Sequence, residues 1–345
     1  MRENSSLLNP EIQRDRLSTT LARIPVNLNG LALGLSGLGL AWKAGDDLLF
    51  RSPTLRGCSD MVAMFMLNAS GSLILMYLCK LVAAPKASFD ELNSADSIAS
   101  LCTMDMALMS IALLLRMHGV TGASFLLWSC GCFLHYLLLL YFIYRVFVVE
   151  GYSWSKYRPS WMIPPIGICI AAGTGYEVGV GTLADLFFYQ GLLAFAFLFP
   201  AAVFRAHFCG LPEEEVNEPQ YAILAAPSAL LLCNWITIGG GSQDWLTHIL
   251  FLVEIFAACL VFAKMQVFAR FSFTVHQASF TFPADITAKA MIMYTLVVLP
   301  QNFFFASLSF ILLGFASIVV LVVSLRYLTA ALDDISDKSP LTPVA

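Results

Sequence analysis

Long apolar runs separated by short polar connections dominate this sequence. A helix that crosses the ~30 Å hydrocarbon core of a bilayer needs about 20 mostly apolar residues. Ten runs approach or exceed this length, and they predict an all-α integral membrane protein with ten transmembrane helices. The runs are Pro25–Trp42, Met61–Ala83, Ile98–Leu115, Phe125–Val148, Ile163–Tyr176, Ala184–Phe204, Tyr221–Thr237, Trp245–Phe268, Ser279–Leu299 and Phe303–Leu328. The fifth run is short and glycine-rich, so a re-entrant segment is its alternative.

Composition supports this class and excludes others. Hydrophobic residues make up 59% of the chain and charged residues 12%, whereas soluble domains carry about 25% charged residues. A net charge of −4 argues against a nucleic-acid partner, because phosphate backbones require cationic surfaces. We expect a cytoplasmic N-terminal segment (1–24), one transmembrane domain (25–328) and a cytoplasmic tail (329–345). The polar start of the chain predicts that no signal peptide is cleaved.

The basic residues of the connections indicate orientation. With ten spans, fourteen Lys and Arg residues fall on the side of the two termini and four on the opposite side, while Lys289 lies within a span. Loops on the cytoplasmic side carry the excess of positive charge. Both termini of this multi-pass protein are therefore expected in the cytoplasm.

The odd-numbered runs contain the irregular backbone, which favours a place inside the protein. In lipid, backbone groups freed by proline must find partners within the protein, and small residues let another helix approach closely. We therefore expect the odd helices to form an inner ring and the even helices an outer ring. The alternative is that proline is simply common in membrane helices. We expect kinks at the prolines of these helices, and the candidate pore-lining or kink residues are Pro25, Gly30, Gly34, Pro164, Pro227 and Pro283.

The ninth run combines charge, a proline and an aromatic ring. Asp285 and Lys289 stand four residues apart in the favourable order for an ion pair, and ionisable groups within membranes face the protein interior or water. Phe282 shares their helical face. Its ring could plug a narrow pore, or it could pack beside an internal ion pair.

Further polar residues lie within other runs. Asp105 in the third run and Asn234 in the seventh are candidates to face a pore, because they lie on odd runs. His135 and Glu254 lie on even runs and are expected to form interhelical hydrogen bonds or subunit contacts. The nine cysteines lie mostly in apolar runs, which indicates neither a disulfide framework nor a metal site. No cofactor is expected.

Three segments carry a resemblance to one known family. They are PVNLNGLALGLSGLGLAW in the first run, EPQYAILAAPS leading into the seventh and FTFPADITA in the ninth. Together with the ten-span layout, they resemble the tellurite-resistance/dicarboxylate transporter family over about residues 23–330. This family includes TehA-like proteins and the plant slow anion channels.

The resemblance implies a fold, an assembly and a gate. It implies five helical hairpins around a central pore, with odd helices inside and even helices outside, and a homotrimer in which each protomer has its own pore. It also implies that Phe282 occludes the pore. Asp105, Asp285 and Lys289 depart from the family pattern, so the ion carried by a relative does not transfer to this chain.

These considerations favour an anion channel or channel-like transporter of the cytoplasmic membrane that passes small inorganic or carboxylate anions. The alternative is a proton-coupled secondary transporter or exporter of C4-dicarboxylate, sulfite or tellurite-type oxyanions. An enzyme or haem protein is disfavoured, because the sequence has no HExxH, no GxSxG and no suitably paired histidines. The expected partners are membrane lipid and small anions.

Overall fold

The computed structural model describes residues 18–50, 52–210, 218–239, 241–268 and 273–337, and every regular element in these ranges is helical. The long helices are α2 (Leu28–Ala44), α3 (Pro53–Ala83), α5 (Ala95–Met117), α6 (Thr121–Tyr144), α9 (Gly181–Phe204), α11 (Ala226–Ile238), α12 (Trp245–Phe268), α13 (Thr281–Val298) and α14 (Phe303–Asp337). The shorter ones are α4 (Pro85–Glu91), α7 (Ile163–Gly167), α8 (Ile170–Val178), and the 3₁₀ or π segments η2 (Arg145–Val149), η3 (Trp154–Lys156), η4 (Pro159–Met162), η5 (Arg205–Cys209), η6 (Glu218–Ala225) and η7 (Val275–Phe280).

Seven helical stretches of the described chain are long and apolar enough to cross a membrane. The chain is therefore a multi-pass membrane protein. Three of the ten predicted spans fall outside this set. They correspond to α2, which has 17 residues, to the pair α7 and α8, which is interrupted after Gly167, and to α13, which carries Asp285 and Lys289.

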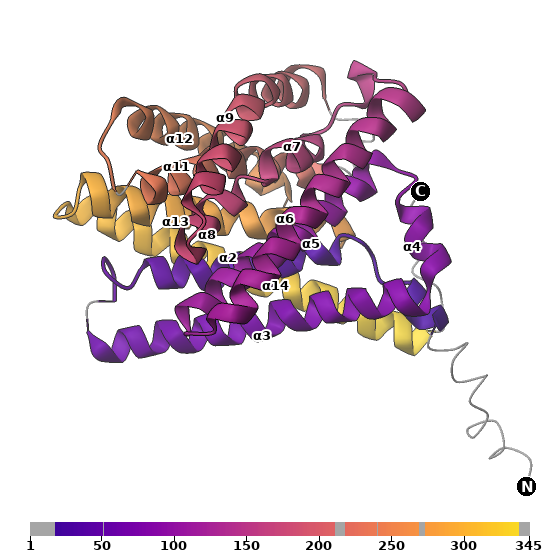
Figure 1. Cartoon of the computed structure of the whole chain (residues 1–345), viewed down its shortest axis with the longest axis horizontal. Helices are drawn as coiled ribbons and strands as arrows, with labels where there is room; N and C mark the ends of the chain where they lie inside the picture. The colour runs from indigo at the N-terminus through magenta and orange to yellow at the C-terminus, as the bar shows by residue number, and fades with distance from the viewer. Residues whose placement is uncertain (1–17, 51, 211–217, 240, 269–272, 338–345) are drawn as a thin grey trace, which may run out of the picture.

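Burial divides the membrane-length stretches into two groups. In α5 and in the stretch Pro219–Ile238, 83% of the most apolar window is buried, whereas the other five have 28–33% of theirs buried. Five inner helices contact one another in a closed series, in which α2 packs on α5, α5 on α8, α8 on α11, α11 on α13 and α13 on α2. The helix that follows each of them in the chain packs against it: α3, α6, α9, α12 and α14. Figure 1 shows one such pair at its lower edge, where α3 runs beside α2.

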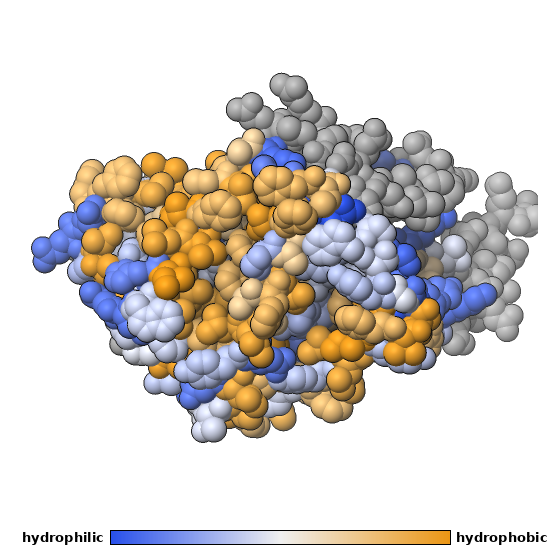
Figure 2. Space-filling model, turned by 90° about the horizontal axis from the view of Figure 1, so that it is seen from above, coloured by the Kyte–Doolittle hydropathy of each residue, from blue (hydrophilic) through white to orange (hydrophobic). Residues whose placement is uncertain are grey.

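The exposed surface is apolar where the outer helices form it. Exposed residues include Phe65 on α3, Phe133 on α6, Phe197 on α9 and Phe310 on α14. Hydrophobic residues cover much of the face seen in Figure 2, and hydrophilic residues gather toward the ends of its long axis. A surface of this kind is stable against lipid rather than water.

Prolines mark helix starts rather than kinks within continuous helices, which corrects the expectation for the odd runs. Pro164 lies in the first turn of α7, Pro227 in that of α11 and Pro283 in that of α13. A 3₁₀ segment (η4, η6 or η7) precedes each of these helices, and Pro25 precedes α2 within a turn. Proline is favourable in a first turn because the N–H that it lacks would have no helical partner there. Among the described α-helices, only the outer helix α9 holds a proline beyond its first turn, at Pro200.

The glycines of α2 allow a close approach to α13 and η7. A Cβ atom at Gly34 would lie 2.2 Å from Thr281 Oγ1, and one at Gly30 would lie 3.3 Å from Ala278 Cβ. The Thr281 hydroxyl also contacts the Gly30 carbonyl oxygen at 3.3 Å. The small-residue face predicted from the sequence is therefore the contact surface between the first and last inner helices.

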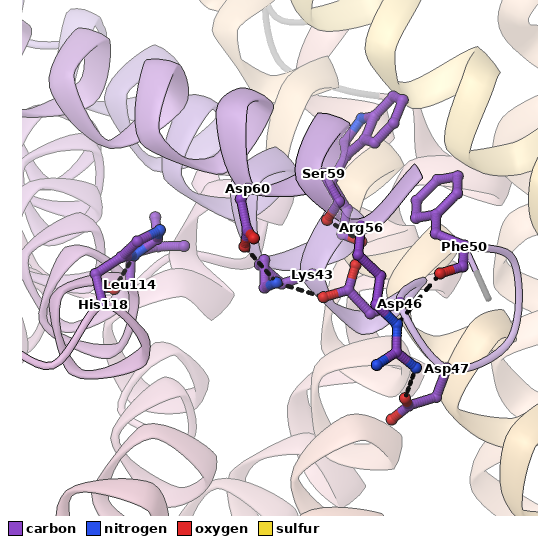
Figure 3. A network of polar contacts seen from close by, with 10 residues as sticks. Lys43, Asp46, Asp47, Phe50, Arg56, Ser59, Asp60, Leu114 and His118 are labelled. Carbon is purple, nitrogen blue, oxygen red and sulfur yellow. Dashed lines mark hydrogen bonds and ion pairs between the residues drawn. The ribbon is translucent and has the colours of Figure 1, made fainter. Parts of the chain in front are cut away.

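The connection between α2 and α3 is held by ion pairs (Figure 3). Lys43 pairs with both Asp46 and Asp60, and the Arg56 guanidinium pairs with Asp47 at 2.9 Å. The Ser52 hydroxyl accepts a hydrogen bond from the Leu55 N–H and caps α3. Both described basic groups of this connection are therefore neutralised by nearby acids.

The α2–α13 contact yields a stability prediction. Gly34→Ala should lower the melting temperature of the purified protein, because the added methyl group overlaps Thr281 and overpacking of this kind costs about 1–3 kcal/mol. Gly71→Ala on α3 is the matched control, since no atom lies within 4 Å of the position of its Cβ. Equal melting temperatures for the two variants would contradict the close packing.

Candidate functional site

A cavity lies at the centre of the inner ring. It encloses about 780 Å³ of empty space, including the part that opens to solvent. All five inner units contribute to its wall: α2, α5, η4 with α7, η6 with α11, and η7 with α13. The cavity is therefore formed by the irregular spans and not by the smooth outer helices.

The lining residues recur at intervals of three or four, which is the spacing of one face of a helix. Along each inner unit, the first lining residue is polar and the last is apolar. The residue between them is polar in some units and apolar in others. The sets are Asn27, Gly30 and Leu33; Ser100, Thr103 and Met106; Ser160, Ile163 and Ile166; Gln220, Ile223 and Pro227, followed by Leu230; and His276, Ser279 and Phe282.

The first residues of these sets form what we call the polar collar: Asn27, Ser100, Ser160, Gln220 and His276. Hydrogen bonds connect four of its members. The Asn27 Nδ2 atom lies 3.4 Å from Ser100 Oγ and 3.4 Å from His276 Nδ1, and the Gln220 Nε2 atom lies 3.4 Å from the same imidazole nitrogen. Amide nitrogens only donate, so His276 Nδ1 acts as an acceptor and its Nε2 atom carries the proton.

Burial also favours the neutral form of the His276 imidazole. Burial lowers the pKa of its imidazole below the ordinary value of 6.5. The Asp96 carboxylate opposes this shift, and the Arg158 guanidinium lowers the pKa further. The collar therefore offers neutral hydrogen-bonding groups to whatever enters the cavity.

An ion pair supports the collar from behind. Arg158 pairs with Asp96 at 2.5 Å. The same carboxylate accepts hydrogen bonds from the Ser160 hydroxyl at 3.2 Å and from the Trp161 indole N–H at 3.0 Å. Because Asp96 binds three partners, it fixes η4 against the start of α5.

The inner end of the cavity is apolar, and Phe282 belongs to it. The side chain is 8% exposed, and its neighbours on the wall include Leu33, Met106, Ile166 and Leu230. A Cβ atom at Gly37 would lie 3.1 Å from the Phe282 ring. The ring thus packs against α2 on one side and lines the cavity on the other.

Asp105 makes a buried hydrogen bond with an outer helix and does not line this cavity. Its Oδ1 atom lies 2.5 Å from His135 Nδ1 on α6, and His135 Nε2 donates to the Pro164 carbonyl oxygen at 2.8 Å. Both side chains are fully buried. The chain of bonds from α5 through α6 to α7 supports the broken fifth span, which supplies Ile163 and Ile166 to the cavity wall.

The same residues form the one group of possible metal ligands found in the described chain. The ligand atoms of Cys102, Asp105 and His135 lie within 4.8 Å of one another. Both imidazole nitrogens already have protein partners, and a structural metal site ordinarily has four ligands. Hydrogen bonding accounts for the cluster, and we assign it no metal.

Asn234 and Glu254 also connect helices. The Asn234 amide donates to the Cys169 carbonyl oxygen at 2.5 Å, where α8 begins. Glu254 on α12 accepts hydrogen bonds from Ser228 on α11 and Thr287 on α13, each at 2.7 Å. The predicted interhelical role of His135 and Glu254 is confirmed, whereas Asn234 does not line the described cavity.

The ion pair expected within the ninth span is not formed. Both carboxylate oxygens of Asp285 are buried without a hydrogen-bond partner, and the ion pairs of the described residues do not join it to Lys289. Asp285 turns toward Gly37 of α2, where a Cβ atom would lie 3.3 Å from its Oδ2 atom. Lys289 lies half-buried within electrostatic reach of Cys233 on α11.

The cavity therefore brings together only some of the predicted residues. Gly30, Pro227, Phe282 and Pro283 line it. The other predicted residues do not belong to its described wall: Pro25, Gly34, Pro164, Asp105, Asn234, Asp285 and Lys289. Sequence reasoning missed the polar collar. The signal that could have found it is a pair of residues near the start of each odd run, a polar one followed six positions later by an apolar one. Asn27 with Leu33 and His276 with Phe282 are examples.

The inner ring, the cavity and the lipid-compatible surface define a membrane protein of the channel or transporter class. The family profile described as voltage-dependent anion channel (SLAC1) matches residues 23–328. The chain belongs to this family, which confirms the resemblance recognised in the sequence. No curated protein matches the chain.

The Asp105–His135 bond yields a prediction about stability. Asp105→Ala should lower the free energy of unfolding by about 3 kcal/mol or more, because it leaves His135 buried without its partner. The double variant with His135→Ala should lose less than the sum of the single losses, by a coupling of about 0.5–3 kcal/mol. Additive losses, measured by unfolding in mixed micelles, would show that the two residues do not act together.

Proposed function

We propose that the protein is an anion channel or channel-like transporter of the cytoplasmic membrane and that Phe282 gates its pore. The observation that carries this proposal is the central cavity, which all five inner units line and whose apolar end includes Phe282. In this proposal the transmembrane domain (25–328) has ten helices in five hairpins. The closed series of α2, α5, α8, α11 and α13 forms its inner layer.

The electrostatics of the cavity suit a small anion. The inner helices α2, α11 and α13 begin beside it, at Leu28, Ala226 and Thr281, and helix N-termini carry partial positive charge. Its described wall contains no Asp or Glu, and the amide, hydroxyl and imidazole groups of the collar can donate hydrogen bonds. Such groups hold an anion weakly enough to release it, as conduction requires.

Membrane orientation follows from the same proposal. Each inner unit begins after a segment rich in Lys and Arg, and the collar lies at these starts. Because such segments lie in the cytoplasm, the cavity opens toward the cytoplasm, where both termini lie. Phe282 then separates the cavity from the opposite side. Each protomer has its own pore, and we expect a homotrimer whose contacts involve outer helices.

Removal of the Phe282 ring tests the gate. In liposomes, Phe282→Ala should raise anion conductance by about tenfold or more, the change produced when a barrier falls by ~1.4 kcal/mol. Phe197→Ala on α9 is the matched control, because that ring is 71% exposed on the outer surface. A Phe282→Ala variant that conducts no more than the wild type and Phe197→Ala would refute the gate.

A proton-coupled secondary transporter of C4-dicarboxylate, sulfite or tellurite-type oxyanions is the second candidate. The buried carboxyl groups of Asp105, Asp285 and Glu254 favour it, since ionisable groups within membranes commonly relay protons. Our proposal of a channel predicts that anion flux in liposomes only dissipates an anion gradient. Accumulation of the anion against its gradient, driven by an imposed pH gradient, would favour the carrier instead.

A further inference from the structure

Asp285 has an environment that differs from those of the other buried acids. Its side chain is 0% exposed, and neither carboxylate oxygen has a hydrogen-bond partner. Asp105 has His135, and Glu254 has Ser228 and Thr287. Asp285 instead packs against Gly37.

A charged carboxylate in this position would be strongly unfavourable. An ionised group removed from water without a partner costs several kcal/mol or more, so it neutralises instead. A protonated carboxyl group avoids this cost while occupying the same space. The geometry is therefore that of a neutral acid.

The groups on the elements packed against α13 do not supply a compensating charge. None of the described ones forms a hydrogen bond or ion pair with Asp285, and several are engaged elsewhere. Lys43 on α2 pairs with Asp46 and Asp60, His276 on η7 bonds to collar amides, and the Tyr221 ring on η6 lies beneath the Lys264 ammonium. The other described titratable groups on these elements are Cys233 on α11; His248, Glu254, Cys259 and Lys264 on α12; Arg326, Tyr327 and Asp333 on α14; and Lys289 and Tyr294 on α13 itself.

Asp285 and the ring of Phe282 pack against the same position of α2. The two residues lie three positions apart on one face of α13, and both approach the same glycine of α2: a Cβ atom at Gly37 would lie 3.1 Å from Phe282 Cδ2 and 3.3 Å from Asp285 Oδ2. A shift of this turn that moved the ring away from the cavity would also separate Asp285 from Gly37 and open the carboxyl group to water. Lys289 lies one turn further along the helix, at a spacing that permits an ion pair.

We propose that Asp285 is a proton-binding site whose occupancy holds the Phe282 gate closed. This inference rests on the proposed function for its readout in conduction. The closed form binds the proton, and the open form releases it to water and pairs the carboxylate with Lys289. Because the closed form holds one more proton, lowering the pH stabilises it, and raising the pH favours opening.

Infrared spectroscopy tests the site without requiring conduction. A protonated carboxyl group has a carbonyl stretching band that a carboxylate lacks. The wild-type protein at neutral pH should show such a band that is lost in Asp285→Asn and retained in Glu254→Gln. A wild-type spectrum that matches Asp285→Asn in this region overturns the proposal.

Conductance against pH tests the coupling. For one released proton, wild-type conductance should rise with pH with a limiting slope of about tenfold per pH unit. Asp285→Asn keeps the shape of the neutral acid but cannot ionise, so its conductance should stay low and independent of pH. Glu254→Gln is the matched control and should keep the wild-type slope.

The outcomes separate this inference from the proposed function. If Phe282→Ala conducts but the wild type and Asp285→Asn have the same conductance profile against pH, the coupling is overturned and the channel stands. A carboxyl band assigned to Asp285 with no conduction by any variant supports the proton site and overturns the channel.

Discussion

A bilayer offers no hydrogen-bond partners to a polypeptide backbone, and this constraint explains where the irregular parts of the chain lie. Backbone that leaves the α-helical pattern must be covered by protein or must line a cavity. The 3₁₀ segments η4, η6 and η7 and the interruption between α7 and α8 all belong to the inner units. Three members of the polar collar, Ser160, Gln220 and His276, reach the cavity wall from these 3₁₀ segments.

The same constraint governs the polar side chains within the membrane domain. Most of the buried acids satisfy it through other helices, as Asp105 does through His135 and Glu254 does through Ser228 and Thr287. These bonds connect outer helices to inner ones and fix the wall of the cavity. Asp285 satisfies the constraint differently, by protonation in our proposal, and that makes it sensitive to movement of the neighbouring ring.

Much of the architecture could be predicted from the sequence, because hydrophobic length and helix-breaking residues are local signals. Gly30, Gly34 and Pro283 marked inner helices, and Gly34 does allow the close α2–α13 contact. Partners could not be predicted in the same way. The Asp285–Lys289 spacing suited an ion pair, but packing against Gly37 turned the carboxyl group away. The collar was missed because its five members come from distant segments and meet only when the ring closes.

The central claim is that the inner ring encloses a water-accessible cavity closed at one end by Phe282. Cysteine accessibility tests it most directly. In a protein whose exposed native cysteines are replaced by serine, Ser279→Cys, which lines the cavity beside Phe282, should react with a membrane-impermeant thiol reagent added on the cytoplasmic side and not with reagent added on the opposite side. Reaction from neither side, or equally from both, would contradict the account.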